Sequence, residues 1–186
     1  MKVLIIDNYD SFTFNLVHLL ESFTEDFEVW RNDEIDFKRV PEFDKIVLSP
    51  GPGLPSDAGQ MPALIKRFAA SIPMLGVCLG CQALGVYFGA ELYNLEKVQH
   101  GVQTPISVLD SSVLYKNLPK EIEVGRYHSW AIQLKANSVL IPTAYDKTGV
   151  LMSFRHKSLS IFGIQYHPES IMTEAGKTLL FNWITS

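Results

Sequence analysis

The first half of the chain alternates between two hydrophobic patterns. Runs rich in apolar residues are typical of buried strands, and three strands are predicted on this basis at residues 2–7, 27–31 and 45–49. Between them, apolar residues recur at helical spacing. The first such set is Phe12, Leu16, Leu19, Leu20 and Phe23, and further helices are predicted over residues 60–70 and 81–88. Strands and helices in alternation predict an α/β protein with a parallel sheet covered on both faces.

The second half has shorter segments in which apolar and polar residues alternate more often. Such alternation is typical of antiparallel strands, so we expect these segments to extend the same sheet. The predicted strands are residues 103–109, 123–127, 139–145, 150–155 and 159–166. A helix over residues 174–184 is predicted to close one face. No linker or repeat interrupts the pattern. The expectation is therefore a single domain, residues 1–186, with three α/β/α layers and a mostly parallel central sheet.

Composition limits the classes of function. The 186 residues are 47% hydrophobic and 19% charged, which indicates a packed domain. The net charge is −4 without a basic cluster, which argues against a nucleic-acid partner. No apolar run approaches the roughly 20 residues that cross a bilayer, and no signal-peptide pattern is present, so a cytoplasmic protein is expected. The two cysteines lack a second Cys/His pair at ligand spacing, so no metal site is expected.

A candidate nucleophile lies within residues 73–82, Pro-Met-Leu-Gly-Val-Cys-Leu-Gly-Cys-Gln. A short apolar run leads to Cys78, which has a glycine two positions away on either side, and a helix-compatible segment follows. This order of strand, sharp turn and helix is that of a nucleophile elbow. A cysteine there lies near the positive end of the following helix, which favours its thiolate. The alternative is a buried cysteine at a strand end, and we expect Cys81 to be such a small core residue.

A candidate base follows the last predicted strand, where the chain reads His167-Pro168-Glu169-Ser170. His167 and Glu169 can reach one site from the end of a strand, and the proline between them restricts the backbone. A cysteine, a histidine and a carboxylate are the nucleophile, proton carrier and orienting group of thiol acyl chemistry. A lone histidine here would more often be structural, but the carboxylate beside it favours catalysis.

Two loops at predicted strand ends add to this picture. Residues 49–55, Ser-Pro-Gly-Pro-Gly-Leu-Pro, cannot form regular structure, and their glycine N–H groups suit the wall of an oxyanion hole. The alternative is an ordinary proline-rich turn. Residues 7–10, Asp-Asn-Tyr-Asp, are predicted to brace neighbouring loops and to have no catalytic role. Ser11 is expected to cap the helix that follows.

These motifs together resemble the class I (triad-type) glutamine amidotransferases, which have a flavodoxin-like fold. The opening segment 6–13, Ile-Asp-Asn-Tyr-Asp-Ser-Phe-Thr, is similar to that of the glutaminase subunits (component II) of anthranilate synthase and aminodeoxychorismate (para-aminobenzoate) synthase. The resemblance runs through the whole chain, with the motifs in the same order.

The resemblance implies hydrolysis of L-glutamine to glutamate and ammonia by a triad of Cys78, His167 and Glu169. It implies an oxyanion hole made by the backbone N–H groups of Gly51 and Leu79. The implied glutamine-binding residues are Gly51, Pro52, Gly53, Gln82, Ser129 and Trp130. The ammonia would pass to a chorismate-binding large subunit (component I). No cofactor is expected in this chain, because the magnesium ion of such complexes belongs to that partner.

Two segments in the second half carry other histidines and are expected to be loops. Residues 97–101 contain His100, and residues 125–130 contain His128; neither histidine has a carboxylate two positions away. The first segment is implied to face the large subunit. Relatives usually read Met-His-Gly-Lys there, whereas this chain has Gln99-His100-Gly101-Val102.

Three other questions of function stay open at this point. The chain could serve anthranilate synthesis, aminodeoxychorismate synthesis, or both. A free-standing cysteine hydrolase of γ-glutamyl substrates would share the triad but need no partner. A non-catalytic flavodoxin-like binding module would leave Cys78 merely buried.

Overall fold

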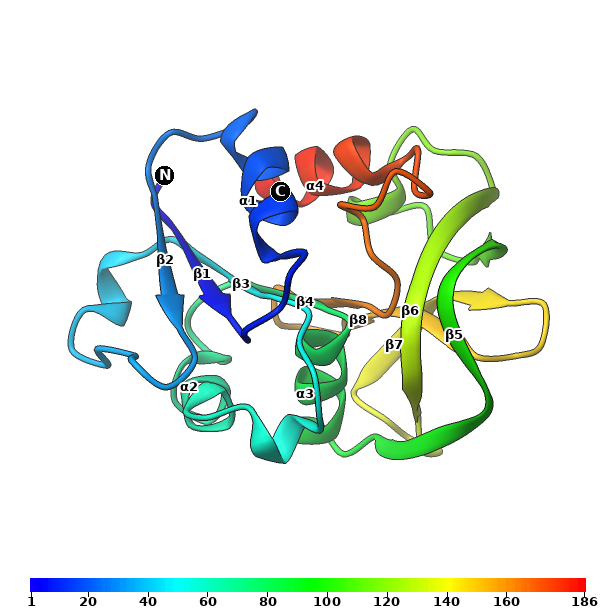
Figure 1. The fold of residues 1–186 in the computed structure, drawn as a ribbon, viewed down its shortest axis with the longest axis horizontal. Coiled ribbons are helices and arrows are strands. Elements are labelled where there is room, and N and C mark those ends of the chain that lie inside the picture. Colours follow the sequence, from blue (N-terminus) through cyan, green and yellow to red (C-terminus); the bar gives the residue numbers. More distant parts are fainter.

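The computed structural model describes residues 1–186 and shows one mixed sheet between two layers of helices (Figure 1). The strands are β1 (Val3–Asp7), β2 (Phe27–Arg31), β3 (Lys45–Leu48), β4 (Met74–Val77), β5 (Glu91–Val108), β6 (Glu121–Gln133), β7 (Leu140–Asp146), β8 (Leu151–His156) and β9 (Ile161–Ile164). The helices are α1 (Thr13–Glu21), α2 (Met61–Phe68), α3 (Leu79–Tyr87) and α4 (Gly176–Ile184). Short 3₁₀ turns occupy Val40–Glu42, Pro55–Asp57 and Val113–Tyr115.

The nine strands follow the order β2-β1-β3-β4-β9-β8-β7-β5-β6. The first five of these are parallel, and β8, β7, β5 and β6 then continue the sheet in antiparallel pairs. The expected parallel sheet with an antiparallel extension is therefore present. The last strand along the chain, β9, lies in the middle, between β4 and β8.

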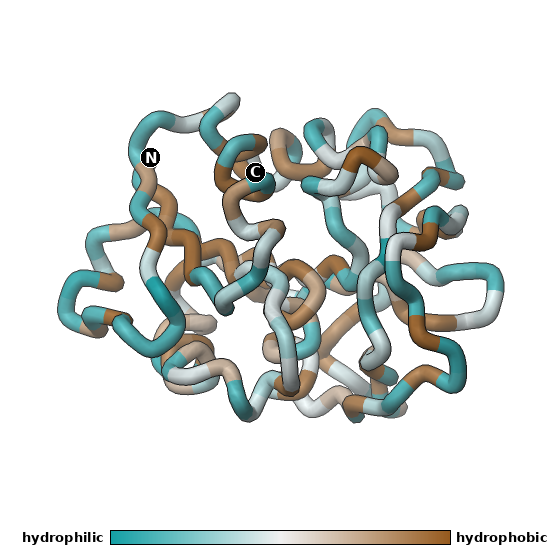
Figure 2. The backbone as a smooth tube through the Cα atoms, in the orientation of Figure 1, coloured by the Kyte–Doolittle hydropathy of each residue, from teal (hydrophilic) through white to brown (hydrophobic).

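Strand β1 shows why the apolar runs of the sequence are continuous. Its residues Val3 and Ile5 pack on one face with α1 and α4, whereas Leu4 and Ile6 pack on the other with α2 and α3. All four side chains are fully buried, so neither face of the strand admits polar residues. In Figure 2 the brown hydrophobic segments accordingly gather in the central strands, and teal segments dominate the outer loops.

The structure differs most from the sequence-based predictions at β5 and β6. Residues 97–101 and 125–130, predicted to be loops, both lie within these two strands and pair with each other, as at Gln99 with His128. The overlapping prediction of a strand over residues 123–127 is confirmed, because β6 includes it. The loop prediction is wrong because most of β5 is exposed or half-buried, so its sequence lacks a continuous apolar run. The pairing is irregular between Asn94 and Gln99, where β5 carries extra residues.

The expected helix cap at Ser11 is also wrong. Helix α1 begins after Phe12, whose backbone N–H donates to the Asp10 carboxylate at 2.7 Å. The local turn chemistry therefore comes from the aspartates that precede Ser11. No helix of the structure is long and apolar enough to cross a bilayer.

Candidate active site

The candidate site lies where the parallel strands β4 and β9 end side by side. Val77 is opposite Ile164 in the register, and the backbone N–H of Cys78 donates to the Ile164 carbonyl at 2.8 Å. The residues that follow the two strands therefore meet at the carboxyl edge of the sheet, which is the usual place for a ligand in such folds. Cys78 follows β4, and His167 lies three residues beyond the end of β9.

Cys78 has the strained backbone that a nucleophile elbow requires. Its φ is 51° and its ψ is −102°, and helix α3 begins at the next residue. The flanking glycines are needed for close packing. A side chain at Gly80 would collide with the Leu48 carbonyl, and one at Gly76 would collide with the backbone of Gly80. The predicted strand, turn and helix are all present.

His167 and Glu169 form a buried pair. The Nδ1 atom of His167 lies 2.6 Å from Oε1 of Glu169, and both side chains are almost fully buried. Burial lowers the pKa of His167, but contacts with the Cys78 sulfur and the Glu169 carboxylate outweigh it and raise the pKa to about 10. The Nε2 atom is buried without a conventional hydrogen bond. This arrangement favours the protonated imidazolium form of His167.

The backbone and ring of His167 are held from several directions. Its N–H donates to the Gly125 carbonyl of β6 at 3.0 Å, and its carbonyl accepts from the Thr173 hydroxyl at 2.7 Å. The rings of Phe12 and Tyr127 lie edge-on to the imidazole, with centroids 5.6 and 5.0 Å away. Motif reasoning misses Phe12, Tyr127 and Thr173, because their sequence positions carry no sign of the contact.

A cavity of about 160 Å³ opens beside Cys78. Its lining is Gly51, Pro52, Gly53, Cys78, Gln82, Tyr127, His128, Ser129 and Trp130. The structure thus brings together all the residues predicted to bind glutamine, from three separate parts of the chain. A larger cavity of about 730 Å³ lies beside β5 and β7 and includes neither Cys78 nor His167.

Gly51 lies against the start of α3, as an oxyanion hole built with Leu79 would require. A Cβ atom at Gly51 would lie 2.8 Å from the Leu79 side chain and 2.5 Å from Cβ of Asn8, so only glycine fits. The loop that contains Gly51 is fastened to the turn after β1. The backbone N–H of Asn8 donates to the Ser49 hydroxyl at 2.9 Å, and the Asn8 side-chain amide donates to the Ser49 carbonyl at 2.9 Å.

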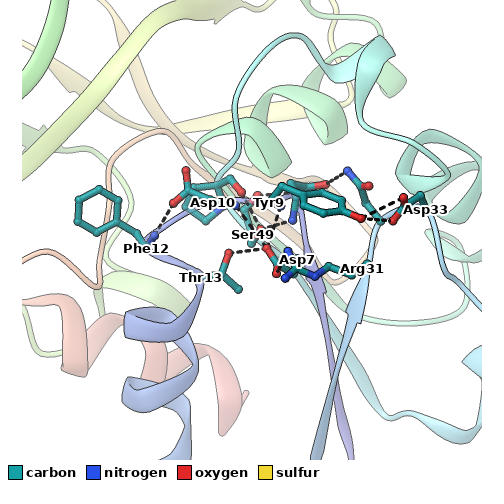
Figure 3. A network of polar contacts seen from close by, with 11 residues as sticks. Asp7, Tyr9, Asp10, Phe12, Thr13, Arg31, Asp33 and Ser49 are labelled. Atoms are coloured by element: carbon teal, nitrogen blue, oxygen red, sulfur yellow. Dashed lines mark hydrogen bonds and ion pairs between the residues drawn. The ribbon is translucent and has the colours of Figure 1, made fainter.

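The turn after β1 braces its neighbours, as predicted. Figure 3 shows Asp7 bonded to Thr13 and to Arg31, whose guanidinium lies 2.9 Å from the carboxylate. The Tyr9 hydroxyl donates to Asp33 at 2.8 Å. These contacts join α1, β2 and the turn into one support for the loop at residues 49–53.

Of the two other histidines singled out in the sequence, His128 has both ring nitrogens engaged. Nε2 accepts from the Arg126 side chain at 3.1 Å, and Nδ1 donates to the Trp130 carbonyl at 2.8 Å. Burial and the Arg126 charge lower its pKa to about 4. A histidine that is neutral and fully bonded has no nitrogen free to move a proton for a substrate.

Cys81 is a core residue in the structure. Its side chain is 1% exposed on α3, and it belongs to the apolar cluster between the sheet and α2. Burial raises the pKa of its thiol, and the nearby Cys78 adds to the effect. No group of three or more His, Cys, Asp and Glu side chains is arranged to hold a metal ion.

Comparisons with known proteins agree on one family. Residues 4–186 match the family model described as glutamine amidotransferase class-I. The chain is 44% identical over 191 residues to anthranilate synthase component 2 of Mycobacterium tuberculosis, in an alignment that covers 100% of this chain and 82% of that one. It is 41% identical over 185 residues to aminodeoxychorismate/anthranilate synthase component 2 of Bacillus subtilis, covering 98% and 95%. The crystal structure of a Thermoplasma acidophilum protein described as part of a GMP synthase matches with a TM-score of 0.89 and 28% identity, covering 100% and 92%.

Proposed function

Because the chain belongs to the class I glutamine amidotransferases, we propose that it is the glutamine-hydrolysing subunit of a chorismate-using synthase. The observation that carries the proposal is the position of Cys78, which lines the cavity on a strained elbow and interacts with His167 of the buried His167–Glu169 pair. The products are glutamate and ammonia.

The proposed reaction begins at Cys78. Its thiolate attacks the side-chain amide carbon of glutamine, and the N–H groups of Gly51 and Leu79 bind the oxyanion. In serine-enzyme precedent the loss of one such donor costs about 3–4 kcal/mol. His167 donates its proton to the departing ammonia and then takes one from the water that hydrolyses the γ-glutamyl thioester. Glu169 holds the imidazole by its Nδ1 atom and stabilises the imidazolium.

The glutamine itself would lie in the 160 Å³ cavity. Both hydrogens of the Gln82 amide nitrogen are used, one for the Trp130 carbonyl at 2.9 Å and one for Gln165 at 3.1 Å. The Gln82 oxygen is left to accept a bond from the α-ammonium group of the substrate. Ser129, Trp130 and the loop at residues 51–53 complete the walls.

The chemistry of ammonia supports the presence of a second, larger subunit that receives it. Free ammonia is protonated in neutral water, so it is useful only when it passes directly to an acceptor. The relatives' names, component 2 of anthranilate synthase or of aminodeoxychorismate/anthranilate synthase, support a heteromeric complex. In the proposed complex the large subunit binds chorismate and the magnesium ion.

Anthranilate synthesis, in tryptophan formation, is our first choice of pathway, because several of the relatives carry the name anthranilate synthase alone. Aminodeoxychorismate synthesis, in folate formation, is the second, since the Bacillus subtilis relative carries both names.

The test uses the complex with its large subunit. Cys78→Ala should abolish glutamine-dependent amination of chorismate and leave ammonia-dependent amination intact, whereas Cys81→Ala, in the core, should keep both. The product, anthranilate or aminodeoxychorismate, identifies the pathway. Glutaminase activity that survives in Cys78→Ala would refute the nucleophile. Full activity of the isolated chain on varied γ-glutamyl substrates would instead favour a free-standing hydrolase.

A further inference from the structure

A chain of buried hydrogen bonds runs from β6 to the candidate nucleophile, and the triad does not account for it. Arg126 donates to His128, and His128 donates to the Trp130 carbonyl. The same carbonyl accepts from Gln82, and Gln82 also donates to Gln165. The last member, Gln165, is fully buried and donates from Nε2 to the Cys78 sulfur at 3.6 Å.

The direction of every bond in this chain is set by the groups at its ends. A guanidinium can only donate, and a backbone carbonyl can only accept. His128 therefore carries its proton on Nδ1, and Gln82 must point its NH₂ group at Trp130. The second N–H of Gln82 then meets the oxygen of Gln165, because the reverse orientation of Gln165 would place two NH₂ groups against each other.

The orientation of Gln165 determines which group faces the Cys78 sulfur. With its oxygen committed to Gln82, Gln165 can present only N–H donors to Cys78. A donor stabilises a charged acceptor more than a neutral one, so this contact favours the thiolate over the thiol. The Gln165 side chain also fixes Gln82, whose remaining oxygen is the acceptor offered to the substrate.

From this geometry we propose that Gln165 is a positioning residue that stabilises the Cys78 thiolate and orients Gln82 for glutamine. The proposal rests on the proposed function, in which Cys78 is the nucleophile. It assigns one amide two effects, one on the reactivity of the sulfur and one on substrate affinity, and the two can be separated by substitution.

The variants Gln165→Glu and Gln165→Met separate the effect on the reactivity of the sulfur from the effect on glutamine affinity. The carboxylate of Glu still accepts from Gln82 but no longer donates to the sulfur, whereas Met does neither. In Gln165→Met the rate of Cys78 alkylation by iodoacetamide should reach its midpoint about one pH unit higher than in the wild type, because the donor is lost. In Gln165→Glu the midpoint should rise further, because the carboxylate also repels the thiolate. In the complex, kcat should fall about tenfold in both, while KM for glutamine should rise only in Gln165→Met.

Matched controls are Gln133→Glu and Gln133→Met at an exposed position of β6, which should leave both measurements unchanged. Thermal unfolding identifies any variant that does not fold. If only one of the two Gln165 variants folds, that variant is sufficient to measure how the alkylation rate depends on pH. An unchanged midpoint in a folded variant would overturn the proposal. If wild-type Cys78 itself reacts no faster than an ordinary thiol at neutral pH, the proposed function fails together with this inference.

Discussion

The Nδ1 atom of His167 lies 2.6 Å from Oε1 of Glu169, and only a proline separates the two residues in the chain. This pairing leaves Nε2 as the one ring nitrogen available to Cys78. His167→Ala should lower the glutaminase kcat by at least about 10³-fold, since no other histidine can replace the proton carrier.

Glu169→Gln should lower kcat by less than His167→Ala does, because orientation of the ring is weakened while the base remains. Steady-state assays of the complex measure both losses, with the exposed His18→Ala as control. A loss in His128→Ala that equals that of His167→Ala, at unchanged glutamine affinity, would mean that the base is His128.

The two cysteines should differ sharply toward an electrophile. A glutamine-like diazo-ketone or chloroketone should label Cys78, which lines the cavity, and spare Cys81, which is buried and whose pKa burial raises. Peptide mapping after labelling at neutral pH reports the site. A principal adduct on Cys81 would contradict the assignment.

Gly51 should not tolerate even one added methyl group. In Gly51→Ala the new Cβ would meet Asn8 and Leu79, so the loop must move away from α3. The expected loss of kcat/KM is of order 10²-fold, as for removal of one oxyanion donor.

The matched control for Gly51→Ala is Gly89→Ala. Gly89 has a φ of 92° and open space around it, so alanine there tests backbone strain alone, which should cost about 1–2 kcal/mol of stability without changing kcat. Normal activity in Gly51→Ala would show that this loop does not form the oxyanion wall.

The neutral state of His128 should make the protein sensitive to acid. Its pKa is about 4 in the fold against 6.5 when unfolded, so the unfolded chain binds the proton more readily between these values. The stability that His128 contributes is present above pH 6.5 and is lost as the pH falls through 4.

The difference between the two pKa values corresponds to at most about 3 kcal/mol. Urea unfolding of the wild type and of His128→Gln at several pH values measures it. The slope of unfolding free energy against pH should flatten in the variant, and an equal slope in both would refute the prediction.

The sequence pattern predicts those elements that are buried in the centre of the fold. Strand β3, for example, is predicted over residues 45–49 and is observed over Lys45–Leu48, where every residue is buried. The long ribbon of β5 and β6 is missed in part, because the pairing of the largely exposed β5 with β6 depends on neighbours that lie far away in sequence. Local hydrophobicity cannot report such contacts.

The candidate site likewise contains residues that the sequence predicts and contacts that it does not. Cys78, His167 and Glu169 can be named from short motifs, since each lies at or just beyond a predicted strand end. The contact of Gln165 with Gln82 cannot, because the residues are 83 positions apart and meet only when α3 and β9 are in place. A polar residue within the apolar run 160–166 is the single sign in the sequence that Gln165 has a partner.

The central place of β9 also sets the time at which the enzyme can first act. Strands β4 and β8 are joined only through β9, so any shorter stretch of the growing polypeptide has two unpaired strand edges in the middle of its sheet. His167 and Glu169 follow β9 directly and cannot reach Cys78 until that strand inserts. By the proposed mechanism, a ribosome-bound or truncated product that stops before β9 consumes no glutamine, while its open edges make it prone to aggregation and to removal.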